Sequence, residues 1–210
     1  MKYQQLIIDH VRSNMTIYMF MTTLLITGIV FGAIIVNSMS FVQKQDLFFH
    51  IEQFFTKLTT DEPIVRKDIL KKSFFSHLQY LLVILLLGLT IIGIPFIWLF
   101  VFLKGLAIGF SVGFIVNQLG FKGLFIATVS IAPQNMIIIP IYIIAASLAH
   151  LFSLLLFHKI SGKVDRTPIR QSFIQYILAY TLLLFIALSG SVIETFISYE
   201  VVKMTINRLI

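Results

Sequence analysis

The chain has 210 residues, of which 58% are hydrophobic and only 12% are charged, with a formal net charge of +7 and no cysteine. A soluble domain carries roughly 25% charged residues, so the composition excludes an ordinary water-soluble globule, and its hydrophobicity excludes a disordered chain. The basic residues lie between apolar segments, as in membrane flanks, rather than in the single patch of a nucleic-acid binder. The composition therefore predicts an all-α polytopic transmembrane bundle, a single domain over residues 1–210.

The first crossing helix is predicted over residues 15–36, where 22 consecutive residues carry no charge. About 20 apolar residues, rising about 1.5 Å each, span the hydrocarbon core of a bilayer. The stretch is too long for the apolar region of a signal peptide, and no small-residue cleavage site follows it. We therefore expect an uncleaved transmembrane helix.

Residues 37–79 form the one sizeable polar segment, and they predict a helical loop outside the hydrocarbon core. Apolar residues recur in its first half at helical spacing: Leu47, Ile51, Phe54, Phe55 and Leu58. Pro63 follows a helix-stopping stretch and predicts the start of a second amphipathic helix. Two interpretations stay open: a hairpin lying in the headgroup region or on its own bundle, and a docking surface for another protein.

Residues 74–119 are long enough for two crossings, because 46 residues would extend about 69 Å as one helix. The turn between them has two candidate positions. A turn at Gly93-Ile94-Pro95 gives crossings over residues 74–94 and 96–119 and places Lys104 inside the membrane, where it costs roughly 3 kcal/mol. A turn at Lys104-Gly105 gives crossings over residues 80–103 and 105–119 instead.

Residues 123–157 are uncharged, and at 35 residues they are too long for one crossing and short for two. Two prolines, Pro133 and Pro140, interrupt this stretch and free backbone carbonyls that lipid cannot satisfy. We expect a re-entrant half-helix, a break over residues 133–140, and a crossing that ends near residue 157. Residues 173–193 predict the last of five crossings.

The basic residues of the short segment 158–172 favour its placement on the cytoplasmic side. Five crossings then put the N-terminus inside and residues 37–79 outside. That outer loop nevertheless holds six basic residues of its own, so the orientation preference is weak.

Glycines at four-residue spacing mark one face of two predicted crossings: Gly28 and Gly32, then Gly105, Gly109 and Gly113. Small residues on one face let helix backbones approach closely in lipid, so we expect helix-packing positions. A second set is polar or helix-breaking within the membrane and would line a site at a broken helix: Lys104, Asn117, Pro133, Gln134, Asn135 and Pro140.

Signs of catalytic chemistry are weak. Ser111 lies in a G-x-S-x-G sequence, but that motif exposes its serine on a strand-to-helix turn, and here it lies within an apolar helical stretch. His150 has no acid in the same apolar stretch to orient it as a base. Asp46, His50 and Glu52 suggest a metal site, and Asp46 and His50 share a helical face, but two weak ligands without a third do not make a site. We therefore expect no enzyme activity, no cofactor and no metal.

Several short motifs follow one another in a fixed order. They are Phe31-Gly32-Ala33-Ile34-Ile35-Val36-Asn37-Ser38, Gln43-Lys44-Gln45-Asp46-Leu47, Gly93-Ile94-Pro95, Phe102-Leu103-Lys104-Gly105, Val112-Gly113-Phe114-Ile115-Val116-Asn117-Gln118, and Pro133-Gln134-Asn135 with Pro140. In this order they resemble the stage II sporulation protein M family of spore-forming Gram-positive bacteria. The resemblance runs from about residue 18 to residue 140, and beyond that the match is one of hydropathy.

The resemblance implies a polytopic protein of the mother-cell and septal membrane that is needed for engulfment of the forespore. It implies a scaffold that localises and anchors two peptidoglycan-degrading partners, the stage II sporulation proteins D and P, and is not itself a hydrolase. We expect the lipid bilayer and these proteins as partners, with no nucleic acid and no small-molecule substrate. The alternative is a transporter or channel-like subunit with a broken-helix site near Pro133–Asn135.

Overall fold

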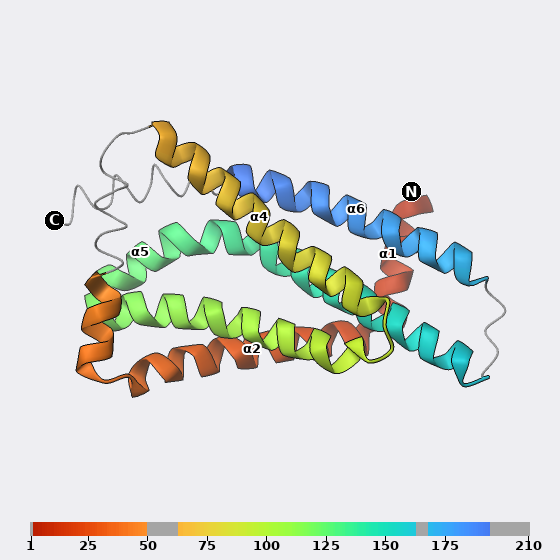
Figure 1. The fold of residues 1–210 in the computed structure, drawn as a ribbon, viewed down its shortest axis with the longest axis horizontal. Coiled ribbons are helices and arrows are strands. Elements are labelled where there is room, and N and C mark those ends of the chain that lie inside the picture. Colours follow the sequence, from red (N-terminus) through yellow and green to blue (C-terminus); the bar gives the residue numbers. More distant parts are fainter. Residues whose placement is uncertain (1, 50–62, 163–167, 194–210) are drawn as a thin grey trace.

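The computed structural model describes residues 2–49, 63–162 and 168–193, which are helical apart from short turns and include no strand. The helices are α1 (Lys2–Ser13), α2 (Met15–Ser38), α4 (Pro63–Gly88), α5 (Gly93–Ile160) and α6 (Ile169–Ile193), as Figure 1 shows. Residues 41–49 form a further short helix, which we call the tip helix.

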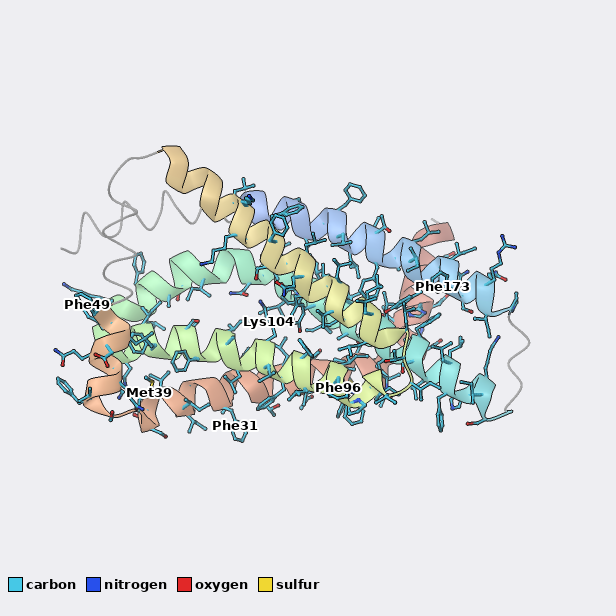
Figure 2. All side chains as sticks on the ribbon, in the orientation of Figure 1. Phe31, Met39, Phe49, Phe96, Lys104 and Phe173 are labelled. Atoms are coloured by element: carbon cyan, nitrogen blue, oxygen red, sulfur yellow. The ribbon has the colours of Figure 1, made fainter. Side chains whose placement is uncertain are left out.

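Five segments are long and apolar enough to cross a membrane: Met15–Ser38, Leu70–Gly88, Gly93–Phe125, Asn135–Ile160 and Ile169–Ala187. The prediction of an all-α polytopic bundle with about five crossings is therefore confirmed. Large apolar side chains cover the outside of these segments, including Phe31, which is 54% exposed and points away from the bundle in Figure 2. Such a surface suits lipid as its surroundings.

α5 is a helical hairpin rather than one straight rod. Gly120 has φ 58° and ψ −133°, and it is the one residue within α5 whose backbone angles are not helical. Glycine adopts such angles readily because it has no Cβ, and open space surrounds the position that a Cβ would take. Backbone conformation rather than packing therefore requires glycine here. We call residues 93–119 the outgoing limb and residues 121–160 the return limb (Figure 1).

The return limb lies at the centre of the bundle. In its Asn135–Ile160 span 56% of the most apolar stretch is buried, against 17–28% in the other four spans. Small residues allow the neighbours to approach: a Cβ at Gly88 of α4 would collide with Ala149 of the return limb and with the Tyr176 hydroxyl of α6. The Tyr180 hydroxyl of α6 also donates a hydrogen bond to the Ala145 carbonyl, at 2.7 Å. α4, α6 and the return limb therefore form one closely packed unit.

The structure places the turn between the second and third crossings at residues 89–92, directly before Gly93. Lys104 accordingly lies 11 residues into α5 rather than at a turn. The second amphipathic piece expected after Pro63 is not a separate helix, because α4 runs unbroken from Pro63 to Gly88. No glycine or proline interrupts residues 64–87, which explains the continuity.

The expected break at residues 133–140 is absent, because the return limb stays helical from residue 121 to residue 160. Figure 1 shows that the limb bends partway along its length instead. Each proline removes a single backbone donor, and proline within a transmembrane helix is tolerated as a kink when the rest of the hydrogen-bond ladder persists. The re-entrant half-helix expected near residues 123–132 is thus the first part of a continuous, bent helix.

Candidate functional site

The five predicted helix-packing glycines meet along one seam between α2 and the outgoing limb. A Cβ at Gly28 or Gly32 would collide with the backbone carbonyls of Phe102 and Leu106, respectively. From the other side, a Cβ at Gly105 or Gly109 would collide with the carbonyls of Leu25 and Ile29. Gly113 continues the seam, since its Cβ would lie 3.1 Å from the Cα of Ala33.

This glycine seam lets the two backbones touch, which is how helices associate in lipid without a hydrophobic driving force. Val36, at the far end of α2, is also buried. The seam therefore packs the second half of α2, from Leu25 to Val36, closely against the outgoing limb.

A second feature is the environment of Lys104, which is half-buried on the outgoing limb. Its Nζ lies 5.0 Å from the centroid of the Tyr142 ring and 5.3 Å from that of the Tyr80 ring. The two rings lie against each other with their centroids 4.2 Å apart. The Tyr142 hydroxyl is 2.5 Å from Nδ1 of His77. We call Lys104, Tyr80, Tyr142 and His77 the Lys104 cluster.

Lys104 lies within a segment that is long and apolar enough to cross a membrane, and the Lys104 cluster would offset the cost of a lysine at that depth. Placing lysine at the centre of a transmembrane helix costs roughly 3 kcal/mol on insertion scales. A cation within about 6 Å of an aromatic face gains about 0.5–2 kcal/mol, so two tyrosine faces offset much of that cost. Because Tyr80 belongs to α4 and Tyr142 to the return limb, Lys104 also links the outgoing limb to the central unit. Figure 2 shows Lys104 between these elements.

The other predicted polar residues are not gathered around Lys104. Asn117 is exposed and lies 13 residues further along the limb, about 20 Å away. Asn135 is half-buried, and its amide donates to the Ile131 carbonyl of its own helix at 2.9 Å. Pro140 is exposed, while the side chains of Pro133 and Gln134 lie outside the described set. The polar residues therefore form no common site with the lysine among the described side chains.

Ser111 and His150 are engaged in different places. The Ser111 hydroxyl donates to the Ala107 carbonyl at 2.9 Å, within its own helix. His150 Nδ1 accepts a hydrogen bond from the indole N–H of Trp98 at 3.3 Å. Trp98 precedes Ser111 by 13 residues on the same limb, which is about 20 Å along a helix. The two residues therefore do not form a nucleophile–base pair.

The predicted docking segment is described only in part. Leu47 is half-buried on the tip helix, whereas Ile51, Phe54, Phe55 and Leu58 lie outside the described residues, as do His50 and Glu52. The exposed apolar residues of the tip helix are Phe41 at 80%, Val42 at 66% and Phe49 at 57%. Figure 1 places this helix crosswise at the end of the bundle where α5 turns.

A capping box defines the start of the tip helix. The backbone N–H of Ser40 donates to the Gln43 side-chain oxygen at 3.0 Å, and the backbone N–H of Gln43 donates to the Ser40 hydroxyl at 3.4 Å. This reciprocal pair satisfies donors that the first turn of a helix leaves open. One residue, Met39, separates Ser40 from the end of α2, and its extended backbone (φ −68°, ψ 141°) is where the chain leaves the direction of α2.

Sequence reasoning missed His77, Tyr80 and Tyr142 as partners of Lys104. One signal was present, because tyrosine is enriched at the membrane surfaces and both tyrosines lie well inside their spans. A hydroxyl at that depth needs a partner, and the sequence alone does not say which helix supplies it.

The match to known proteins is consistent with this architecture. The family model described as Stage II sporulation protein M matches residues 21–199, more than four fifths of the chain. No curated protein and no solved structure matches the chain.

Proposed function

Because the chain belongs to the stage II sporulation protein M family, we propose that it is a non-catalytic membrane scaffold in endospore formation. In this role it localises and holds peptidoglycan-degrading proteins at the septum during engulfment of the forespore, from within the mother-cell membrane. The partners that the family resemblance implies are the stage II sporulation proteins D and P. The chain itself lies in the lipid bilayer, and the proposed role requires no cofactor.

The observation that carries this proposal is the exposed apolar surface of the tip helix. Phe41 is 80% exposed and Val42 is 66% exposed, on a helix that leaves the crossing segments. Apolar side chains grouped at the end of a bundle are typical of protein–protein contact sites. The glycine seam supports the same role, because it packs α2, which directly precedes the tip helix, against the outgoing limb. The residues predicted for docking between positions 51 and 58 continue the same segment.

The test is recovery of the two partners with tagged protein from detergent extracts of sporulating cells. We expect Phe41→Ser combined with Val42→Ser to reduce recovery strongly while membrane insertion is unchanged. The matched control is Phe121→Ser, because Phe121 is 93% exposed next to the Gly120 turn, at the same end of the bundle. Equal recovery with all variants would contradict docking at the tip helix.

A transporter or channel-like subunit is the less supported alternative. Lys104 faces tyrosine rings, and Asn117 and Asn135 lie away from it. The return limb is bent rather than broken, so it does not offer the two opposed helix ends with which transporters bind ions. The glycine seam further supports close packing of α2 and the outgoing limb.

A further inference from the structure

An amphipathic helix precedes the first crossing. Apolar residues of α1 recur at four-residue spacing in the sequence, and Val11 is the member of this apolar set whose side chain the structure describes. Gln5, Asp9 and Arg12 fall on the opposite face. Figure 1 shows α1 lying crosswise to the long axis of the bundle, along which α2 runs. A helix crosswise to a membrane-spanning helix lies parallel to the membrane surface.

The bend between α1 and α2 falls at Asn14, whose φ of −115° and ψ of 20° are not helical. The Asn14 side-chain amide donates to the His10 carbonyl at 2.9 Å, and the Asn14 backbone N–H donates to the same oxygen at 3.2 Å. The Asn14 carbonyl in turn accepts from the backbone N–H of Ile17 at 3.0 Å, in the first turn of α2. The His10 ring also lies edge-on to the ring of Tyr18, with centroids 6.5 Å apart. Asn14 therefore closes one helix and opens the next.

The position of α1 along the bundle matches that of an apolar turn. Residues 89–92 join α4 to α5, and Ile92 is 76% exposed there. The Ser153 hydroxyl donates to the Thr90 carbonyl of this turn at 2.6 Å. From Ser153 the return limb continues seven residues to Ile160, about 10 Å further. In Figure 1 the turn and α1 lie at the same level, and the ends of α5 and α6 extend beyond both.

This level has the features of a membrane surface. An exposed isoleucine in the turn needs apolar surroundings, while exposed Arg12, at the end of α1, and Arg170, beyond this level at the start of α6, need polar ones. Val11, on the apolar face of α1, is 38% exposed and so is incompletely covered by the protein. At a membrane surface, lipid acyl chains would cover the exposed apolar side chains, and the lipid headgroups would surround the arginines. Arginine side chains close to the surface also attract anionic lipid.

We propose that α1 is an in-plane anchor whose apolar face enters the acyl boundary and whose arginine, together with Arg170, binds the headgroups of anionic phospholipids. The partner is thus the lipid surface at the end of the bundle opposite the tip helix. This inference is independent of partner docking, since it concerns different residues at a different end of the molecule.

The geometry can be tested with spin labels, because the native chain has no cysteine. Val11→Cys and Asp9→Cys would each be labelled in the full chain, reconstituted in nanodiscs of phosphatidylcholine with phosphatidylglycerol. We expect the label at position 11 to be accessible to oxygen and protected from a water-soluble nickel chelate, and the label at position 9 to show the reverse. Equal nickel accessibility at both positions would overturn the in-plane placement.

The lipid class can be tested by the amount of phosphatidylglycerol that stays bound after purification from mixed-lipid nanodiscs into mild detergent. Each arginine near an anionic surface is worth about a fivefold preference. We therefore expect Arg12→Gln with Arg170→Gln to lower retained phosphatidylglycerol at least several-fold relative to phosphatidylcholine. Gln171→Ala, at an exposed uncharged residue next to Arg170, is the matched control and should leave retention unchanged. An equal loss in both variants, or no loss in either, would overturn the proposed site.

Discussion

Lys104 Nζ lies 5.0 Å from the centre of the Tyr142 ring, which joins the two limbs of α5 across the interior of the bundle. The same tyrosine contacts His77 of α4 through its hydroxyl. One intramembrane cation is thereby tied to three helical segments, and its surroundings are those of a structural link rather than an ion pathway.

A double-mutant cycle tests this link. Tyr142→Leu should cost more stability in the native background than in a Lys104→Met background, because only the native chain loses a cation–π contact. We expect a coupling of about 1–2 kcal/mol, measured as the free energy of unfolding in detergent micelles. The cycle cancels the loss of the His77 contact, which both backgrounds share. A coupling near zero would show that the tyrosine ring does not stabilise the lysine.

The glycine seam predicts that added side-chain bulk destabilises the protein on the side of the outgoing limb that faces α2, but not on its exposed side. Gly109→Ala forces a Cβ into the Ile29 carbonyl and should lower stability by about 1–3 kcal/mol through overpacking. Ala107→Leu adds more bulk to the same limb, but at an exposed position, and should change stability little. Thermal unfolding followed by circular dichroism compares the two variants. If they behave alike, the backbones of α2 and the outgoing limb are not in contact at residue 109.

The Gly120 turn predicts a penalty that comes from backbone conformation alone. Gly120→Ala should destabilise the protein by about 1–3 kcal/mol, because a Cβ is strained at φ 58° and ψ −133° even though space is available. Phe121→Ala, at the neighbouring exposed residue, serves as the control and should stay within about 0.5 kcal/mol of the native chain. Chemical unfolding in mixed micelles measures both. A neutral Gly120→Ala variant would mean that the limbs are joined differently.

Two serines of the same chemistry should differ in their contribution to stability. Ser153 donates to the Thr90 carbonyl in the turn between α4 and α5, where that carbonyl has left the regular helix ladder. Ser111 donates only to a carbonyl of its own helix. We expect Ser153→Ala to cost about 0.6–1.7 kcal/mol, the range of interhelical hydrogen bonds in membranes, and Ser111→Ala to be close to neutral. Unfolding free energies in one detergent would reveal the difference, and equal costs would argue against the interhelical bond.

Much of the fold could be predicted from local patterns. In the hydrocarbon core of a bilayer no water can bond the backbone, so an uncharged stretch of about 20 residues forms a crossing helix. The number of crossings could therefore be predicted from the length and charge of each stretch. Pro63 was expected in a first helical turn, and α4 begins there. The glycines were expected on helix-packing faces because their four-residue spacing is visible in one dimension.

The remaining features depend on contacts between distant segments. Whether Pro133 and Pro140 break or bend a helix depends on what supports the return limb, whose Asn135–Ile160 part is the most buried of the five spans. The surroundings of Lys104 combine residues 77, 80 and 142, which no local spacing connects. The amphipathic character of α1 is present in the sequence, but its crosswise direction arises at Asn14, where φ −115° and ψ 20° leave the helical range.

In the proposed function, this chain holds peptidoglycan-degrading partners in place rather than cleaving anything itself. The most direct measurement is the position of fluorescently tagged stage II sporulation proteins D and P in sporulating cells that lack or carry the chain. We predict septal fluorescence in its presence and dispersed fluorescence in its absence. Restoration should follow from the native chain and not from the Phe41→Ser, Val42→Ser variant. Septal localisation of both hydrolases without the chain would contradict the account.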